Sequence, residues 1–393
     1  MTDGEAAAAP SRRRGWFVVA GLAVVAAGVL GWAFTRGGGK PAPPPLPPGA
    51  IAVDVWAPYW TLADTLPETS ERLADVREVS PFWFGARGVD QIVIDEHADA
   101  DRIDEFIDAV GSTPALLVPS IRDETAGGVM ARILADPDTR AEHIDTLMAF
   151  ADDLDVAGLD LDYEQFAFAD GRATWATTRP HWIEFVSELA TRLHADGRTL
   201  TITIPPVYDD GQTDASGYWV YDHGAIAAHA DAIRIMAYDY STSEAGPIAP
   251  LDWVTRAVEG VSAAVPEEFH HKLVLGVPAY GSNWVVATEG ECPATAEGKT
   301  NVSVRSVAEL AERRGGRPLF DPGYGEWTFD YDLTVTDGAT ECVQSREVRW
   351  VGADGVADRA EIGRRAGWGG VSLWALGYED DADAIRIAND TSY

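Results

Sequence analysis

The sequence is poor in residues that build metal sites and in positive charge. Two cysteines and eight histidines occur among 393 residues, and the histidines are not clustered. A standard structural zinc site is therefore excluded, and no signature of another metal or of a cofactor occurs. Lysine and arginine total 30 against 63 aspartates and glutamates, which gives a net charge of −33. Such an acidic body repels phosphate backbones, which excludes nucleic acid as a partner.

Long apolar runs are also scarce. One stretch, residues 15–34, is uncharged and mostly apolar, and about 20 such residues can cross a ~30 Å hydrocarbon layer as a helix. Trp16 and Trp32 lie near its ends, as interfacial aromatic residues do. Three arginines at 12–14 precede the run, which predicts a cytoplasmic N-terminus over 1–14, a single transmembrane helix and an extracytoplasmic body at the cell membrane. The alternative is secretion after cleavage of a signal peptide, although no convincing small-x-small cleavage site follows.

Residues 35–50 form a glycine- and proline-rich linker, with six prolines between positions 41 and 48. Because proline lacks an N–H and has a fixed φ, this segment should be an extended polyproline-II spacer. The folded domain should then span residues 51–393, and we expect it to be a monomer.

From residue 51 onward, short β-branched runs alternate with amphipathic helical stretches, which predicts parallel strands joined by helical crossovers. The expected helices include 128–135, 139–152 and 180–195, the last opened by Pro180. Eight such units over about 340 residues indicate an α/β fold, a (β/α)8 TIM barrel. The expected strands are 51–56, 76–79, 115–119, 157–163, 200–204, 232–237, 273–277 and 370–374.

The segment between the seventh and eighth expected strands is too long for a loop and one helix. It contains short β-like runs, which predicts a small α+β insertion at about 282–347 beside the barrel mouth. Both cysteines, Cys292 and Cys342, fall in this segment. They form either a disulfide or two free buried thiols, and an oxidising compartment favours the disulfide.

One expected strand carries a row of carboxylates. Residues 158–164 read GLDLDYE, and side chains alternate along a strand, so Asp160, Asp162 and Glu164 share one face. The opposite face is apolar, which indicates a strand inside a barrel rather than a solvated acidic edge. Because close, buried carboxylates raise one another's pKa at a cost in stability, such a row indicates function. A protonated glutamate at the barrel mouth could donate its proton to a leaving oxygen.

This segment closely resembles the D-G-x-D-x-D-x-E motif of the family 18 glycoside hydrolases, the chitinase family. Residues 236–239 (MAYD) are similar to that family's sixth-strand motif, and residues 246–250 to the loop after it. Residues 272–281 (KLVLGVPAYG) and 369–374 (GGVSLW) resemble its seventh and eighth strands. The resemblance runs in family order from residue 51 to about 381. The overall sequence pattern most resembles that of bacterial spore-germination and peptidoglycan-active members.

The resemblance implies a retaining glycoside hydrolase that cleaves β-linked N-acetylglucosamine polymers by substrate-assisted catalysis. Glu164 would act as general acid and then general base, and Asp162 would orient the substrate's acetamido group. Asp160 would tune Asp162, and Tyr238 would donate a hydrogen bond to the acetamido oxygen. The expected substrate-binding residues are Trp374, Asp239, Met236 and Tyr59, although Tyr59 and the nearby Trp56 could instead belong to the core.

One position departs from the motif, because Ala157 stands where the family has its first aspartate. This puts the tuning of the neighbouring carboxylates in doubt. Two alternatives stay open on the sequence: a catalytically inactive, lectin-like barrel that binds carbohydrate, and peptidoglycan rather than chitin as the substrate.

Overall fold

The computed structural model describes residues 51–207 and 218–379. The predicted transmembrane helix and proline-rich linker lie outside these ranges. Within them, no helix combines the length and apolar character needed to cross a membrane.

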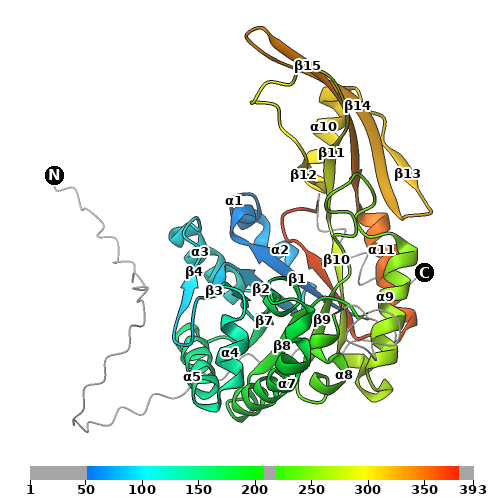
Figure 1. The fold of residues 1–393 in the computed structure, drawn as a ribbon. Helices are drawn as coiled ribbons and strands as arrows, with labels where there is room; N and C mark the ends of the chain where they lie inside the picture. The colour runs from blue at the N-terminus through cyan, green and yellow to red at the C-terminus, as the bar shows by residue number, and fades with distance from the viewer. Residues whose placement is uncertain (1–50, 208–217, 380–393) are drawn as a thin grey trace, which may run out of the picture.

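Parallel strands form a barrel with eight positions around its wall (Figure 1). In chain order the positions are taken by β1 (Ala52–Pro58), β2 with β3 (Glu78–Phe82, Phe84–Ala86), β5 with β6 (Leu116–Leu117, Ser120–Asp123), β7 (Gly158–Asp162), β8 (Thr199–Ile204), β9 (Ala232–Met236), β10 (Leu273–Pro278) and β16 (Gly370–Trp374).

The barrel closes through two strands that are each interrupted once. β2 and β3 are parts of one strand, separated at Trp83, and β5 and β6 are parts of the next. Because β2 pairs with β5 and β3 pairs with β6, both in parallel, the second position is bonded to the third. The eighth strand β16 pairs with β1 and completes the ring. A short strand, β4 (Ile92–Ile94), pairs with β3 in antiparallel orientation.

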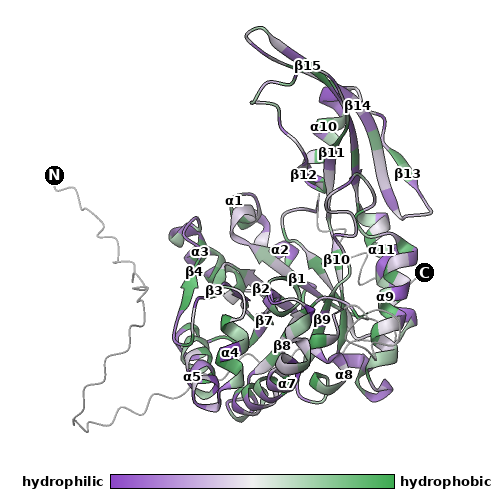
Figure 2. Ribbon diagram, viewed as in Figure 1, coloured by the Kyte–Doolittle hydropathy of each residue, from purple (hydrophilic) through white to green (hydrophobic). Residues whose placement is uncertain are grey.

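Helices surround the barrel, and in Figure 2 their turns alternate between apolar and polar residues, as amphipathic helices do. They are α1 (Leu62–Thr65), α2 (Thr69–Arg72), α3 (Ala100–Gly111), α4 (Val129–Ala135), α5 (Pro137–Leu154), α6 (Gln165–Phe168), α7 (Arg172–Ala195), α8 (His223–Ile226), α9 (Leu251–Ala264) and α11 (Ala353–Arg365). Short 3-10 turns occur at Tyr59–Thr61, Leu66–Glu68, Trp219–Tyr221 and Glu267–Lys272.

The prediction that Pro180 opens a helix is wrong, because α7 begins eight residues earlier, at Arg172. Proline inside a helix removes one backbone hydrogen bond, here to the carbonyl of Ala176. Both residues lie on the exposed side of α7, where water can reach that carbonyl. The buried side of the early helix is fixed by Trp175, whose indole N–H donates to the carbonyl oxygen of Phe166 at 2.8 Å. Tertiary packing therefore outweighs the local preference of proline.

A five-stranded antiparallel sheet with one helix lies between β10 and β16, where the sequence predicts an insertion. It extends from Tyr280 to Trp350, and its β14–β15 hairpin projects away from the barrel (Figure 1). Cys292 and Cys342 are joined by a disulfide inside this unit, as predicted. Its elements are β11 (Tyr280–Gly290), β12 (Thr300–Ser303), α10 (Val304–Arg314), β13 (Leu319–Asp321), β14 (Glu326–Asp337) and β15 (Thr340–Trp350).

A buried ion pair connects the insertion to the barrel. Glu326, at the start of β14, accepts hydrogen bonds from the backbone N–H groups of Ile248 and Ala249 at 2.8 to 3.1 Å. Arg359 of α11 lies 3.4 Å from the same carboxylate, and neither side chain is exposed to solvent. This contact holds the base of the insertion at the C-terminal end of the barrel strands.

Candidate active site

The three carboxylates predicted to act together lie on one strand and the turn after it. β7 places Asp160 and Asp162 inside the barrel, with Asp160 fully buried and Asp162 4% exposed. Glu164 follows the end of β7 at the N-terminus of α6, and it is half-buried. The row therefore runs from the barrel interior up to its mouth, at the C-terminal ends of the strands, where TIM barrels place their active sites.

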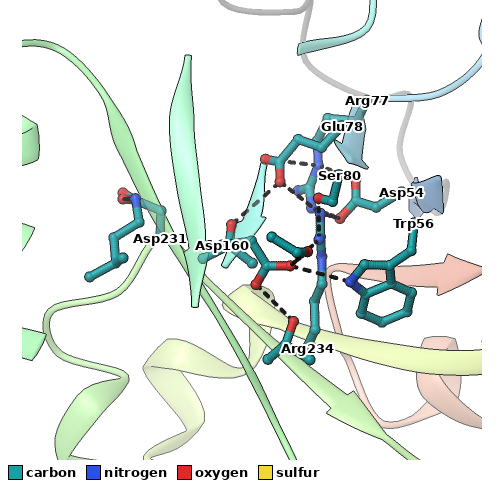
Figure 3. Close-up of polar contacts among 12 residues, drawn as sticks. Asp54, Trp56, Arg77, Glu78, Ser80, Asp160, Asp231 and Arg234 are labelled. Carbon is teal, nitrogen blue, oxygen red and sulfur yellow. Dashed lines mark hydrogen bonds and ion pairs between the residues drawn. The ribbon is translucent and has the colours of Figure 1, made fainter. Parts of the chain in front are cut away.

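Asp160 lies at the lower end of this row and has four hydrogen-bond donors. Its Oδ2 accepts from the indole N–H of Trp56 at 3.2 Å, from Ser120 Oγ at 2.5 Å and from Arg234 at 3.0 Å (Figure 3). Its Oδ1 accepts from Thr203 Oγ1 at 2.8 Å. Trp56 is thereby a buried partner of Asp160.

Asp162 is the middle member, and its pKa is raised well above its ordinary value. Burial is the main cause, followed by the negative charges of Glu164 and Asp160, while Arg122 acts in the opposite direction. Its Oδ1 has no hydrogen-bond partner among the described residues. One polar atom of Asp162 is therefore unsatisfied beside Glu164.

Glu164 has its pKa raised to about 7, by burial first and then by the negative charge of Asp239. At neutral pH a large fraction of this glutamate keeps its proton. A general acid works best when its pKa lies near the working pH, because it then holds the proton and can still release it. Glu164 therefore has the property needed to protonate a leaving group.

The sixth barrel strand supplies the residues that face these carboxylates. Tyr238 follows β9, and its pKa is raised, mainly by burial and then by Asp162. Asp239 comes next at the exposed mouth and accepts a hydrogen bond from the hydroxyl of Tyr280. Met236 ends β9 beside Gly276. A Cβ on Gly276 would come within 2.7 Å of the Ile235 carbonyl oxygen and 3.1 Å of the Tyr238 ring, so glycine there allows the close approach of β9 and leaves room for Tyr238.

An aromatic group lies where the eighth strand meets the first two. Trp374 ends β16, with its ring centroid 4.7 Å from that of Phe82 and 6.3 Å from that of Trp60. Tyr59 packs edge-on against Trp60 at 5.0 Å, and both follow β1. Trp60 is 45% exposed and Trp374 is half-buried. An exposed aromatic surface of this kind suits the apolar face of a sugar ring.

Ala157, the departure from the motif, does not interrupt the row of carboxylates. It lies just before β7, with its N–H bonded to the Leu117 carbonyl and its own carbonyl bonded to Thr199. β7 begins at the next residue, Gly158, and carries Asp160 and Asp162 without interruption.

Sequence reasoning missed two arginines that lie close to the carboxylates. Arg122 of β6 pairs in register with Asp162, and Arg234 of β9 contacts Asp160. Arg122 falls outside the strand predicted at 115–119, so its direction could not be assigned. Arg234 was inside a predicted strand, where a single charge in the run AIRIMA is an unusual feature that could have identified it. In the described ranges, no group of three or more His, Cys, Asp and Glu side chains could hold a metal ion.

A closed parallel barrel with a proton-holding glutamate and a second carboxyl at its mouth is the arrangement of a glycoside hydrolase. Comparison with known proteins agrees. Residues 92–379 match Glycosyl hydrolases family 18, and the chain belongs to this family.

Two relatives illustrate the similarity in sequence. The putative sporulation-specific glycosylase YdhD of Bacillus subtilis (strain 168) is 30% identical over 194 residues, which cover 48% of this chain and 43% of YdhD. The class V chitinase of Arabidopsis thaliana is 24% identical over 294 residues, covering 68% of this chain and 70% of the plant protein.

Solved structures share the fold at lower sequence identity. The C-terminal domain of a putative chitinase from Desulfitobacterium hafniense DCB-2 has a TM-score of 0.68 at 20% identity, covering 88% of this chain and 100% of that domain. The spore cortex-lytic enzyme SleL of Bacillus megaterium QM B1551 has a TM-score of 0.67 at 15% identity, covering 86% of this chain and 74% of SleL.

Proposed function

We propose that this protein is a retaining glycoside hydrolase that cleaves β-linked polymers of N-acetylglucosamine, of the chitin or the peptidoglycan type. The observation that carries the proposal is Glu164, whose pKa is raised to about 7 beside Asp162 and Asp239. Membership of family 18 supports it, as do similar proteins named as a chitinase and as a sporulation glycosylase.

In the first step Glu164 donates its proton to the glycosidic oxygen as that bond breaks. The carbonyl oxygen of the substrate's own acetamido group attacks the anomeric carbon and forms a cyclic intermediate. Asp162 accepts the acetamido N–H through its unsatisfied carboxyl oxygen, and the Tyr238 hydroxyl donates to the acetamido oxygen. These contacts orient the internal nucleophile and stabilise the positive charge that develops on it.

In the second step the Glu164 carboxylate takes a proton from water. The water attacks the anomeric carbon from the face opposite the acetamido oxygen, and the bond between that oxygen and the anomeric carbon breaks. Two inversions retain the configuration. Trp374, Tyr59, Met236 and Asp239 would hold the sugar ring at the mouth. We further propose that the N-terminal apolar run anchors the chain in the membrane with the barrel outside the cytoplasm, the alternative being secretion.

The proposal is tested by incubating purified full-length protein, in detergent, with chitooligosaccharides and separately with peptidoglycan, and identifying the products by mass. Hydrolysis of one substrate assigns the polymer. Binding to either glycan without any product would contradict hydrolysis and support the lectin-like alternative.

The catalytic mechanism has a sharper test in the substrate. A glycan without the N-acetyl group at the cleaved position has no internal nucleophile and should not be cleaved. A cyclic thiazoline that mimics the intermediate should inhibit, because the site is complementary to that high-energy state. Rapid cleavage of fully deacetylated glycan, with no thiazoline inhibition, would rule out substrate assistance.

A further inference from the structure

The barrel interior below the active site is charged, whereas TIM barrels usually fill this space with branched aliphatic side chains. Arg234 of β9 is fully buried at its centre. Its guanidinium lies 3.0 Å from Asp160, 3.1 Å from Glu78 and 3.5 Å from Asp54, and it donates to Ser80 Oγ at 2.6 Å (Figure 3).

The contacts of Asp160 favour a fixed carboxylate. Its four donors come from four different strands, β1, β6, β8 and β9, and they occupy both of its oxygens. A carboxylate is an acceptor only, whereas a protonated carboxyl must donate. Rotation of Asp160 toward Asp162 would break these bonds and leave buried donors unsatisfied, which is costly.

The charges in this cluster can balance without protonating Asp160. Three carboxylates, Asp54, Glu78 and Asp160, face two arginines, since Arg77 also pairs with Asp54 at 2.6 Å. One proton is needed for neutrality. The pKa of Glu78 is raised, by burial first and then by the charge of Asp54, which favours the placement of that proton on Glu78. The cluster is then neutral with Asp160 ionised.

We propose that Arg234 is a positioning residue of the hydrolytic reaction. It holds Asp160 as a fixed anion, which acts on Asp162 through its negative charge. This inference rests on the proposed function of Asp162 and Glu164. It identifies the residue that keeps the carboxylate row charged at its buried end.

The consequence is that the charge of Asp160 helps to set the pH range over which the Asp162–Glu164 pair loses its protons. The two groups titrate as a coupled unit. The charge of Asp160 makes it harder for Asp162 to lose its proton. The other charged and titratable groups around the pair are Arg122 of β6, Tyr238 and Asp239 after β9, and Tyr218 and Tyr221 before α8. The hydrogen-bond and ion-pair partners of Arg234 are Ser80, Asp160, Glu78 and Asp54, so its replacement removes no contact of these groups.

The test is the pH dependence of kcat in Arg234→Met, Asp160→Asn and the double variant, all as full-length protein. Without the positive charge of Arg234, Asp160 should take up a proton and lose its negative charge. The acid limb of the profile should then move to lower pH by about one unit, the size of effect expected when a nearby like charge is removed. Asp160→Asn should give the same shift, and the double variant should add nothing to it.

Two controls separate this from a general loss of structure. Arg77→Met removes an arginine of the same cluster that does not contact Asp160, and it should leave the limb in place. Arg234→Lys keeps a positive charge and should restore most of the wild-type profile. An unshifted limb in Arg234→Met, with only a lower rate, would overturn the inference. If Arg234→Met does not fold, the comparison is between Asp160→Asn and the double variant. Acid limbs at different pH in these two proteins would then overturn the inference.

A spectroscopic readout does not depend on hydrolysis. Infrared difference spectra at neutral pH should show a protonated carboxyl in Arg234→Met that disappears in Arg234→Met/Asp160→Asn. Wild type and Asp160→Asn should show no such difference, and a protonated Asp160 in the wild type would contradict the inference. Inactivity of the wild type on every glycan would count against the proposed function and leave this infrared test standing.

Discussion

Glu164 and Asp162 show how a residue's surroundings decide its chemistry. Both are carboxyl groups near the end of one strand. Asp162 lies between two other carboxylates inside the barrel, while Glu164 lies higher, beside the exposed Asp239. Burial raises the pKa of both, and the position of each determines which one can meet a leaving group.

Replacing Glu164 with glutamine tests its role directly. Glu164→Gln keeps the size of the side chain and removes the transferable proton, so kcat should fall by about 10²- to 10⁴-fold, the usual contribution of general acid–base catalysis. Glycan binding, followed by tryptophan fluorescence, should be largely kept. Glu184→Gln, on the outer surface of α7, is the matched control and should leave kcat unchanged. A Glu164→Gln enzyme within a few-fold of wild type would contradict the assignment.

The raised pKa of Glu164 also predicts a dependence of stability on pH. Its pKa is about 7 in the folded protein against an ordinary value of 4.5, so the folded state binds this proton more tightly than the unfolded state. The resulting stabilisation is complete below about 4.5 and is lost as pH rises through about 7.

Glu164→Gln should remove this slope. Measured by urea unfolding, the variant should gain stability relative to wild type between pH 5 and pH 8, on the order of 2 kcal/mol. A constant difference between the two proteins across that range would show that Glu164 has an ordinary pKa in the folded protein.

At the scale of elements, the interrupted second and third strands shape the site. β2 ends at Phe82, just before the break at Trp83, and β6 resumes the third strand after its own break. β6 carries Arg122, whose guanidinium lies 5.2 Å from the centre of the Phe82 ring. The expected strands at 76–79 and 115–119 stop before these residues. Local sequence preferences do not show that a strand resumes after a short break, because the resumed part is held by its neighbours.

The contact between Glu326 and Arg359 should dominate the attachment of the insertion. Glu326→Ala leaves two backbone N–H groups and a buried arginine without their carboxylate, and breaking a buried pair in this way costs about 3 to 5 kcal/mol. The measurement is the free energy of unfolding in urea. Glu309→Ala, which removes an exposed ion pair with Arg313 in the same insertion, should cause no measurable change. Equal effects of the two substitutions would show that the contact between Glu326 and Arg359 does not stabilise the attachment of the insertion.

At the scale of the whole molecule, the described barrel carries a proposed glycan site at one end, and the sequence places an apolar run and a spacer before it. Protease applied to intact cells should release a soluble fragment that begins within residues 37–50. The measurement is N-terminal sequencing of the released fragment. A full-length chain that stays protected, or that fractionates with the cytosol, would contradict the proposed anchor.

The sequence alone determined much of this protein. Period-two alternation placed Asp160 and Asp162 on one face of a strand, and the repeat of strands and helices predicted the barrel, because both signals are local in the chain. The two cysteines in one inserted segment were predicted to pair because an oxidising compartment favours a disulfide.

Tertiary structure decided what these residues contact. Arg234 and Asp160 are 74 residues apart, and Trp56 and Asp160 are 104 apart. Such partners meet only when the barrel closes, and no local pattern encodes which inward side chains share a layer. The charge of Asp160, and with it the pKa of Asp162, therefore depends on contacts that form only in the complete fold.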